Sequence, residues 1–319
     1  MAEAERGAQF NHQAHTQAVK LTVQLAAKPR TLVGDAWRRF RKHRMAMFGA
    51  AVFLLLVLAV AIIPLVSTAN FRRPDFTKSM WAPSLEHPMG TDDLGRDMLV
   101  RVMRGGRVSL AVGVAAMLIS VTLGTLIGAL AGFLGGRVDS ILMRITDLFL
   151  ALPVVPLLLL LIFLFRDTLR RSFGPENGIF ILIVTVIGIL NWMTVARLVR
   201  SSFLSLKQKE FVEAAHALGI GEATIMFKHI LPNAVGPIIV AATLGIGSAI
   251  ITESVLSFLG LGFPPDTPTW GRLLYDGQNF LDFAPWMVLW PGFLIFLTVL
   301  SINFVGDGLR DALDPRSRL

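Results

Sequence analysis

The chain has 319 residues, of which 54% are hydrophobic and 16% are charged, and its formal net charge is +8. A soluble globular protein usually carries about 25% charged residues, so the composition favours a membrane protein. The chain has no cysteine, which excludes disulfides, thiolate metal sites and cysteine nucleophiles. The positive charge is only a weak argument for a nucleic-acid partner, because basic residues beside membrane spans set topology and meet anionic lipid.

The amino-terminal region is polar and ends in the basic run WRRFRKHR. It does not have the pattern of a cleavable signal peptide. We expect residues 1–30 to form a disordered cytoplasmic tail. The pattern of residues 31–44 favours an amphipathic basic helix on the inner membrane surface. This helix and the first span, which follows it, together cover residues 31–71. We interpret this basic helix as a topology anchor rather than as a specific lipid site.

Six stretches of the chain contain no Asp, Glu, Lys or Arg. A helix needs about 20 apolar residues to cross a hydrocarbon core of roughly 30 Å. Only helices and closed β-barrels can pair all their backbone hydrogen-bonding groups within hydrocarbon. The strands of a barrel alternate polar and apolar residues, whereas these stretches are apolar throughout, so they favour helices. The stretches are residues 45–71, 108–136, 148–165, 177–196, 230–252 and 283–306. We therefore predict an all-α membrane protein with six transmembrane helices.

The distribution of basic residues predicts the topology. If the amino terminus is inside, 19 of the 30 Lys and Arg residues lie in inner segments, which favours cytoplasmic termini in the cytoplasmic (inner) membrane. The segment 72–107 fits less well, with seven basic and five acidic residues, but long loops follow the rule less strictly. We expect an external loop at 72–107, a five-helix core at 108–306 and a cytoplasmic tail at 307–319.

The third apolar stretch begins with the sequence RITDLFLALPVVP. Arg144 and Asp147 are three residues apart, so they can pair on one helix face. We favour such a structural pair over a proton or ion site. Pro153 and Pro156 predict a kink in this span.

The second apolar stretch contains glycine at every fourth position, at Gly124, Gly128 and Gly132. A doubled GxxxG pattern makes a flat groove in which another helix can approach closely. The pattern predicts a packed bundle. It leaves open whether the neighbouring helix belongs to this chain or to a partner.

Three residues in the later spans are candidates for lining a transport pathway: Trp192, Glu253 and Asn303. Each is equally plausible as a helix-packing residue. Glu253 lies near the outer end of the fifth span, where it either lines a polar pathway or reaches the membrane interface.

Motifs for covalent chemistry are absent from the sequence. The chain has no GxxxxGK[ST] phosphate-binding loop, no GxSxG and no HExxH. Paired carboxylates in the middle of a span, expected of a proton-driven carrier, are also missing. These absences argue against an intramembrane enzyme and predict no catalytic residue, no metal and no cofactor held by this chain.

A hydrophilic segment, EFVEAAHALGIGEATIMFKHILPN, joins the fourth and fifth apolar stretches. Its Glu-Ala-Ala run favours a helix that Gly219 would stop, because glycine tolerates the left-handed conformation. A second short helix would begin at Glu222 and end before Pro232, because the residue preceding proline avoids the α region. The segment therefore predicts a helix-turn-helix on the inner side, with small alanines on an exposed face that another protein can approach.

This segment resembles the EAA loop of binding-protein-dependent ABC importer permeases. In that family the loop docks into a cleft on the ATPase subunit, so the resemblance implies that residues 200–232 form a cytoplasmic coupling loop. His229 stands where the family usually has isoleucine. The residues that the resemblance assigns to ATPase coupling are Phe211, Glu213, Ala214, Ala215, Gly219, Leu231 and Pro232.

Four further motifs look like the C-type permease subunit of oligopeptide and dipeptide importers, so the resemblance covers about residues 31–319. The motifs are GTDDLGRDMLVRVMRGGRVSLAVG, GGRVDSILMR, SFLGLGFPPDTPTWGRLL and NFVGDGLRDALDPR. The resemblance implies a type I ABC importer permease fold. It also implies a heterodimer with a B-type permease subunit, two ATPase subunits that bind ATP and Mg, and an external or periplasmic substrate-binding protein.

The expected function is therefore that of a permease subunit that couples ATPase closure to alternating access for peptides or related small solutes. The cargo remains open between peptides, nickel, opines, sugars and glutathione, because most selectivity belongs to the binding protein. The alternative is a secondary transporter driven by an ion gradient. Such carriers show internal inverted repeats, which this sequence does not.

Overall fold

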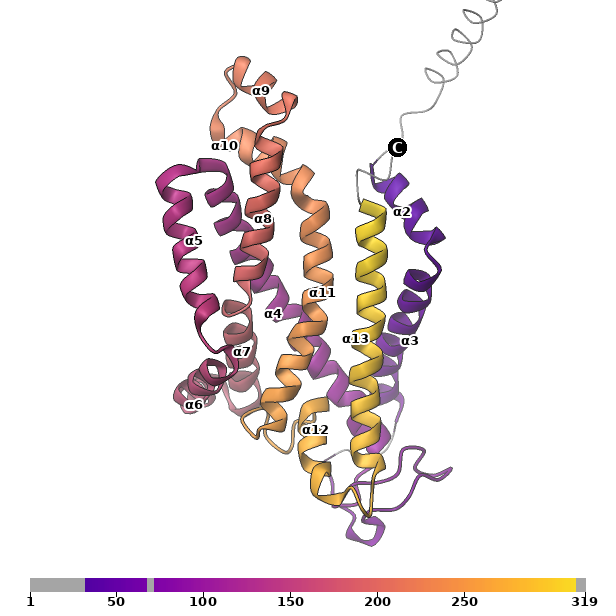
Figure 1. Ribbon diagram of the computed structural model, residues 1–319. Helices are drawn as coiled ribbons and strands as arrows, with labels where there is room; N and C mark the ends of the chain where they lie inside the picture. The colour runs from indigo at the N-terminus through magenta and orange to yellow at the C-terminus, as the bar shows by residue number, and fades with distance from the viewer. Residues whose placement is uncertain (1–31, 68–71, 314–319) are drawn as a thin grey trace, which may run out of the picture.

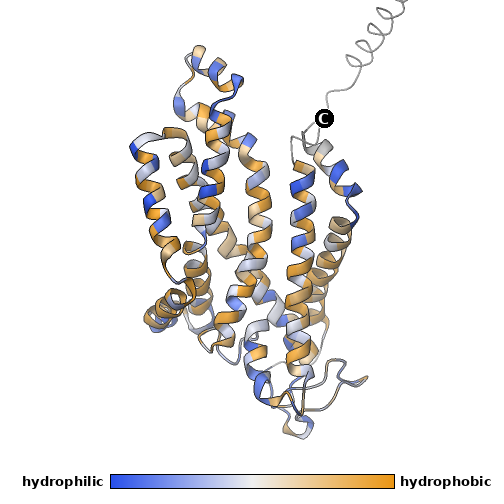
Figure 2. Ribbon diagram, in the orientation of Figure 1, coloured by the Kyte–Doolittle hydropathy of each residue, from blue (hydrophilic) through white to orange (hydrophobic). Residues whose placement is uncertain are grey.

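The computed structural model describes residues 32–67 and 72–313, so the predicted tail at residues 1–30 lies outside the described residues. Helices and the loops between them make up the described part, and its single β feature is an isolated bridge between Thr91 and Asp97. Its long helices run along one another in an elongated bundle (Figure 1). Hydropathy varies along that bundle: most of its length is apolar, and hydrophilic residues gather towards the ends (Figure 2).

The helices fall into two groups by position. The bundle consists of α3 (Arg44–Val66), α4 (Met98–Leu134), α5 (Gly136–Ala151), α7 (Pro175–Ile189), α8 (Trp192–Lys207), α11 (Leu231–Phe258) and α13 (Trp286–Leu313). Of the remaining longer helices, α2 (Leu32–Lys42) lies at one end of the bundle, and α6 (Val154–Phe173) lies crosswise near the other (Figure 1). Shorter elements lie at its ends: η1 (Phe76–Lys78), α9 (Glu210–Ala217), α10 (Glu222–Thr224), the π-helical turn η2 (Ile225–Ile230), α12 (Trp270–Gly277) and η3 (Gln278–Phe280).

Five helical stretches among the described residues are long and apolar enough to cross a membrane, and the bent pair α5–α6 would make a sixth span. This confirms the predicted all-α membrane fold. The predicted boundaries at residues 107 and 306 fall inside α4 and α13. A charge-free run marks only the part of a helix that can lie in the hydrocarbon core, whereas the helix itself continues into the headgroup region and the water beyond it.

The third predicted span, residues 148–165, has the predicted kink, but as a full break between two helices rather than a bend in one. α5 ends at Ala151, α6 begins at Val154, and the two axes differ by 86°. Pro153 lies at the break, since proline has no N–H to continue α5. Pro156 causes no kink, because it lies in the first turn of α6, where backbone N–H groups have no helical partner.

The predicted pair of Arg144 with Asp147 is wrong. Asp147 instead forms an ion pair with Arg197 of α8, and both side chains are more than half exposed. α5 packs beside α8, so a long guanidinium from the neighbouring helix reaches the carboxylate. Sequence spacing shows partners only within one helix. An exposed pair of this kind adds about 0–1 kcal/mol to stability.

The glycine groove of α4 packs against α8 of the same chain, which settles the alternative left open by the sequence. A Cβ atom added at Gly124 would lie 2.6 Å from the Cβ of Val195. One added at Gly128 would lie 2.4 Å from the carbonyl oxygen of Ala196. Gly132 meets α8 in the same way one turn later. These approaches are too close for any side chain, so the two backbones touch.

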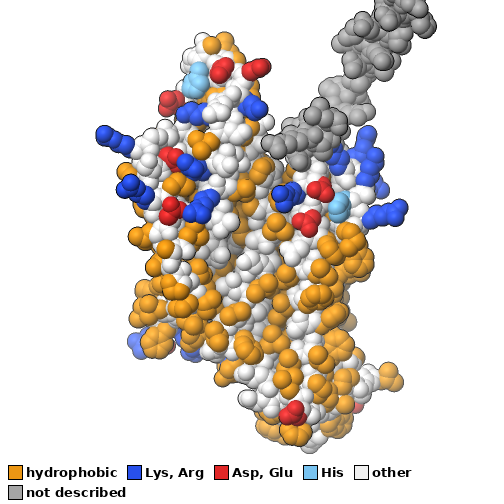
Figure 3. Space-filling view, viewed as in Figure 1, with side chains coloured by type: hydrophobic (Ala, Val, Ile, Leu, Met, Phe, Trp, Pro, Cys, Tyr) orange, Lys and Arg blue, Asp and Glu red, His pale blue; other side chains and the backbone are white. Residues whose placement is uncertain are grey.

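The two ends of the molecule differ in their elements. α9, α10, the start of α5, α2 and the end of α13 lie at one end, and α12, the segment 72–97 and the α6–α7 junction lie at the other (Figure 1). Charged side chains gather at the α9 end, and a broad apolar band follows below them (Figure 3). The segments predicted to share a side of the membrane therefore do lie together.

Buried charges fix α12 to the start of α4. Arg101 is 1% exposed and lies 3.3 Å from Asp92 and 3.5 Å from Asp276. Arg96 pairs with Asp92 at 2.7 Å, and Arg272 pairs with Asp276 at 2.9 Å. Burial raises the pKa of Asp276 against the opposing effect of Arg272 and Arg101. Removing one partner of such a buried set would leave an uncompensated charge, so the set holds this end of the bundle together.

Candidate functional site

The connection between α8 and α11 projects from one end of the bundle (Figure 1). After α8 the chain passes two residues and forms α9, then turns and returns through α10 and η2. We call residues 208–230 the elbow. The predicted helix-turn-helix is present in the elbow. The structure differs from the prediction in how the second helix ends and in which residues are exposed.

Gly219 ends α9 as predicted. Its φ is +71°, in the left-handed region that favours glycine. The Gly219 N–H donates to the carbonyl of His216 at 2.9 Å, and the Ile220 N–H donates to the carbonyl of Ala215 at 3.1 Å. This pair of bonds is a Schellman motif, which satisfies the last carbonyls of the helix. A Cβ at Gly219 would meet nothing within 4 Å, so backbone conformation and not crowding requires glycine here.

The prediction that Leu231 and Pro232 stop the second helix is wrong. The helical run is continuous from Glu222 to Phe258. The Leu231 N–H donates to the carbonyl of Met226, five residues back, which makes the preceding turn a π-turn. The wider turn brings the chain to Pro232, which lies in the first turn of α11. The elbow is therefore a direct extension of a membrane-spanning helix.

The inner face of the elbow is apolar and buried. Val212 is 1% exposed and Ala215 is 4% exposed, and both pack against Phe203 of α8 and Ile225 of η2. The prediction that the alanines lie on an exposed face is therefore wrong for Ala215. Ala215 lies about one turn after Val212, so both side chains are on the face of α9 that packs against α8 and η2.

The outer face of the elbow also displays apolar side chains, although it lies at the hydrophilic end of the molecule. Phe211 is 39% exposed, Leu218 is 80% exposed and Phe227 is 48% exposed. Phe211, Ala214 and Leu218 follow one another at spacings of three and four residues, so they share one helix face. Exposed apolar side chains grouped on a polar element indicate a protein-binding surface.

Of these exposed apolar residues, Phe211 was predicted from the sequence, whereas Leu218 and Phe227 were not. The signal was available for Leu218, because residues 211, 214 and 218 form a second apolar stripe beside the stripe of Val212 and Ala215. No comparable signal marks Phe227, whose orientation depends on the π-turn.

Glu213 adds a charge to this outer face. Its side chain is exposed and forms no hydrogen bond or ion pair with another residue that the structure describes. It lies in the first turn of α9, where the helix dipole favours a negative charge. Of the seven predicted coupling residues, Phe211, Glu213, Ala214, Gly219 and Pro232 are exposed, Leu231 is half-buried, and Ala215 is buried.

The base of the elbow is tied to neighbouring helices by basic side chains of α8. Lys207 Nζ donates to the carbonyl of Phe133 at 2.7 Å, at the end of α4. Arg200 donates two hydrogen bonds of 2.5 Å to the carboxylate of Asp139, at the start of α5. A bidentate guanidinium–carboxylate pair fixes both distance and orientation. These bonds join α8, at the base of the elbow, to the end of α4 and the start of α5.

Comparison with known families identifies the chain. The family described as "Binding-protein-dependent transport system inner membrane component" matches residues 124–319. The chain belongs to this family. The N-terminal TM domain of oligopeptide transport permease C matches residues 31–83 of the same chain. The elbow and four of the five unbroken candidate spans overlap the first match.

Curated relatives match the permease along nearly its whole length. The oligopeptide transport system permease protein OppC of Escherichia coli K12 is 42% identical over 92% of this chain and 94% of its own. OppC of Bacillus subtilis is 39% identical over 92% and 93%. The dipeptide transport system permease protein DppC of Alkalihalophilus pseudofirmus is 39% identical over 89% and 90%.

Solved structures confirm the fold. An inward-facing structure of the MetNI methionine ABC transporter matches 68% of this permease and 98% of its own chain, with a TM-score of 0.55 and 20% identity. The family and the curated relatives show that the chain is a permease subunit of an ABC importer and not an enzyme. The alternative of an ion-driven secondary transporter finds no support among these likenesses.

Glu253 is enclosed by the permease itself. It is 0% exposed, and its carboxylate accepts hydrogen bonds from Ser109 at 3.0 Å and from Ser257 at 2.7 Å. Ser109 in turn accepts the backbone N–H of Trp270 at 3.2 Å. The carboxyl group therefore joins α4, α11 and the first residue of α12. In this conformation it reaches neither a surface nor the membrane interface.

The other two candidate pathway residues differ in exposure. Trp192 is 6% exposed and packs edge-on against Phe149, with 6.2 Å between ring centroids. Asn303 is exposed on α13. In this conformation only Asn303 presents its side chain on the outside of the chain, where a pathway shared with another subunit would lie. Pathway lining by the three residues stays a prediction.

Proposed function

We propose that this permease forms half of the transmembrane pathway of an importer for peptides or related small solutes. The names of its relatives support this cargo class, since oligopeptide and dipeptide permeases match about nine-tenths of the chain. A B-type permease subunit completes the pathway. A substrate-binding protein delivers the cargo on the external or periplasmic side, at the end that contains α12.

Hydrolysis of ATP is the task of two partner ATPase subunits, which bind ATP and Mg. The sequence of the permease supports this division, because it contains no phosphate-binding loop. We place the ATPases at the end that contains the elbow, in the cytoplasm, together with both termini. The concentration of basic residues at that end supports this orientation in the inner membrane.

The two-faced elbow is the observation that supports coupling. Its outer face offers Phe211, Leu218 and Glu213 to a partner, and its inner face is packed onto the spans. When the ATPases close on ATP, the elbow moves with them, and the helices attached to its base follow. Allosteric coupling of this type typically amounts to about 1–3 kcal/mol, or 5–150-fold in an equilibrium constant.

The test uses the complete importer reconstituted in proteoliposomes, with ATP hydrolysis and uptake of a labelled peptide measured in parallel. Glu213→Lys reverses the exposed charge of the outer face, and Gly219→Asp strains the turn at positive φ. We expect both variants to lower uptake per ATP hydrolysed by about tenfold, within the range of such couplings.

Asp307→Lys is the matched control. Asp307 is exposed on α13 and lies at the same end of the molecule outside the elbow, so the charge change is equal but distant. We expect this variant to keep its ratio of uptake to hydrolysis. Normal ATP-dependent uptake by both elbow variants would refute the proposed coupling role.

A further inference from the structure

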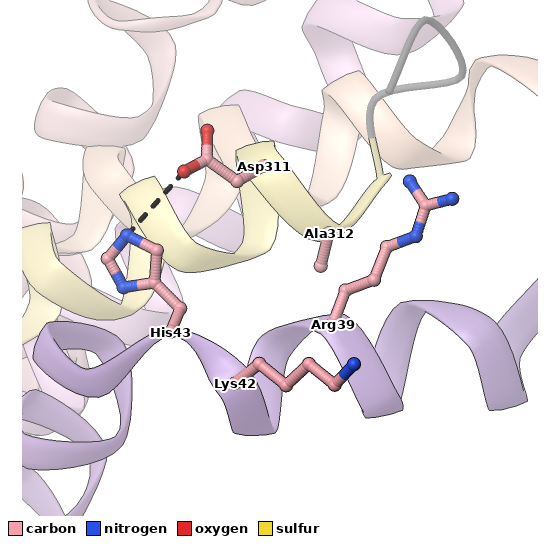
Figure 4. Close-up of a pocket in the computed structure, with 5 residues that line it drawn as sticks. All are labelled: Arg39, Lys42, His43, Asp311 and Ala312. Atoms are coloured by element: carbon pink, nitrogen blue, oxygen red, sulfur yellow. Dashed lines mark ion pairs between the residues drawn. The ribbon is translucent and has the colours of Figure 1, made fainter. Parts of the chain in front are cut away.

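The helices that reach the elbow end of the molecule differ in how firmly polar contacts hold them there. Basic side chains tie α8 to α4 and α5. Near the end of α13, Asp311 Oδ2 lies 3.5 Å from His43 Nε2, between α2 and α3 (Figure 4). Residues 222–237 lead from the elbow into α11, and among the described residues their single side-chain hydrogen bond joins Asn233 to His229 of the same segment. Polar contacts therefore restrain α11 least.

This connection also contains a weak point in an otherwise continuous helix. The π-turn η2 covers Ile225–Ile230, and the Leu231 N–H donates to the carbonyl of Met226. The next residue, Pro232, has no N–H and donates no bond back into the turn. Helices bend sharply at prolines and at π-turns, because the regular hydrogen-bond ladder is interrupted there. Both interruptions fall here on adjacent residues.

The π-turn has an alternative arrangement of equal bond count. In an α-helix the Leu231 N–H would donate to Phe227, four residues back, in place of Met226. The change exchanges one carbonyl acceptor for the next and costs Leu231 no hydrogen bond. Each residue of an α-helix turns the chain by about 100°, so moving one residue between the π-turn and the α-helix rotates the elbow relative to α11. Single π-turns within helices are frequent at functional sites.

The π-turn also lies at the boundary between two packed units. Ile225 of η2 is 0% exposed and packs with Val212 and Ala215 of α9, so η2 belongs to the elbow. Beyond the turn, α11 packs against α4 and α13 along the span. Pro232 at the junction is exposed. A bend at this residue therefore moves no proline ring out of a core.

We propose that η2 and Pro232 form the hinge of the elbow, at which α11 bends when the ATPases close. This inference rests on the proposed coupling function and adds its moving part. The outer face of the elbow binds the ATPase, the ties of α8 support one arm, and the hinge lets the other arm turn against that support. The extra residue of the π-turn is then needed for movement and not for docking.

Deletion of Lys228 tests this separation of movement from docking. It takes one residue out of the π-turn, so the Leu231 N–H and the Met226 carbonyl become four residues apart and their bond closes an α-turn. Met226 and Ile230 become three residues apart and stay on one helix face. In the reconstituted importer we expect uptake per ATP hydrolysed to fall by about tenfold, within the usual range of allosteric coupling. Gel filtration should show the ATPase subunits still bound.

Two matched controls separate the hinge from its side chains. Lys228→Ala keeps the residue count and removes only an exposed side chain, so it should stay within about twofold of the unmodified importer. Pro232→Ala restores an N–H within the hinge and should lower the uptake ratio by about threefold, the usual net effect of one backbone hydrogen bond. Pro237→Ala restores an N–H five residues further into α11, outside the π-turn, and should stay within about twofold.

The bend can be measured directly with spin labels, because introduced cysteines are the only thiols of the chain. Labels at Ala217→Cys and Val255→Cys lie on opposite sides of the hinge, whereas labels at Val235→Cys and Val255→Cys both lie in α11. All three positions are exposed. Trapping the importer with ATP and vanadate should shift the electron–electron distance of the first pair and not of the second. Deletion of Lys228 should abolish the shift.

Three results would overturn the hinge. A first-pair distance that does not change on trapping would mean that the elbow and α11 move as one body, and equal shifts in both pairs would place the bend within α11. Normal uptake per ATP in the Lys228 deletion would show that the π-turn is not needed. Loss of the ATPases from that deletion would assign the turn to docking. Failure of the proposed coupling is distinct, because Glu213→Lys and Gly219→Asp would then also transport normally.

Discussion

At the scale of single residues, two buried glycines with different surroundings show what the close packing of α4 requires. A Cβ at Gly128 would lie 2.4 Å from the carbonyl oxygen of Ala196 and 2.8 Å from the Cβ of Val199. We expect Gly128→Ala to push α4 and α8 apart and lower the apparent Tm by several degrees, since overpacking costs about 1–3 kcal/mol. Thermal unfolding of the purified permease in detergent measures the change.

Gly247 in α11 is the matched control, because it is also buried in the middle of a helix. The nearest atom to a Cβ added there is 3.6 Å away, in ordinary contact with Val299. Gly247→Ala should leave Tm unchanged or raise it slightly, because alanine favours the helix by roughly 0.5–1 kcal/mol. An equal loss of stability in both variants would show that α4 and α8 do not depend on glycine for their approach.

The sequence predicted a structural feature correctly where that feature depends on residues close together in one helix. The glycine repeat of α4 indicated a close neighbour, and Gly219 indicated a left-handed helix end, because both requirements are local. The partner of Asp147 was not predictable in this way, since Arg197 is 50 residues away in the sequence. The enclosure of Glu253 likewise depends on Ser109 and α12, which only the folded chain brings together.

At the scale of elements, the ion pair between α8 and α5 is one of the contacts through which the proposed motion of the elbow would reach the bundle. The side chains of Arg200 and Asp139 are 34% and 16% exposed, so their bidentate pair is partly shielded from water. We expect Arg200→Asp or Asp139→Arg alone to lower peptide uptake per ATP hydrolysed. The exchanged pair Arg200→Asp/Asp139→Arg should restore part of the loss, because the ion pair can form again.

A double-mutant cycle on unfolding free energy checks the same contact. We expect a coupling energy within the usual range of about 0.5–3 kcal/mol for contacting residues. Asp147 with Arg197 is the matched control pair, since it also joins α5 to α8 but is 59% and 54% exposed. Its coupling should be smaller because solvent screens it. Additive effects at Arg200 and Asp139 would show that the bidentate pair does not hold the elbow's base.

Element boundaries were the part of the fold that sequence predicted least well, and proline shows why. Pro153 ends α5, whereas Pro232, Pro237 and Pro291 lie within continuous helical runs. A proline breaks a helix unless its surroundings compensate for the missing hydrogen bond. At Pro232 the preceding π-turn gives that compensation, and no local sequence signal specifies it.

At the scale of the whole molecule, the elbow and the charged set around Arg101 lie at opposite ends of one bundle (Figure 1). α5 has 16 residues, about 24 Å of helix, which is shorter than a hydrocarbon core of roughly 30 Å. α6 turns by 86° at the end of α5, and its last turn contains Arg170 and Arg171. This geometry supports the proposed sixth span, which would end in a helix lying along the membrane interface, and with it the proposed cytoplasmic location of both termini.

The proposed orientation can be tested directly, because the chain has no cysteine and any introduced thiol is the only one present. Ala217 is exposed in the elbow, Leu85 is fully exposed in the segment before α4, and Ser172 is exposed at the end of α6. In intact cells, a membrane-impermeant maleimide should label Leu85→Cys and Ser172→Cys. Ala217→Cys should react only after permeabilisation. Labelling of Ala217→Cys in intact cells would place the elbow outside, where no ATPase could reach it.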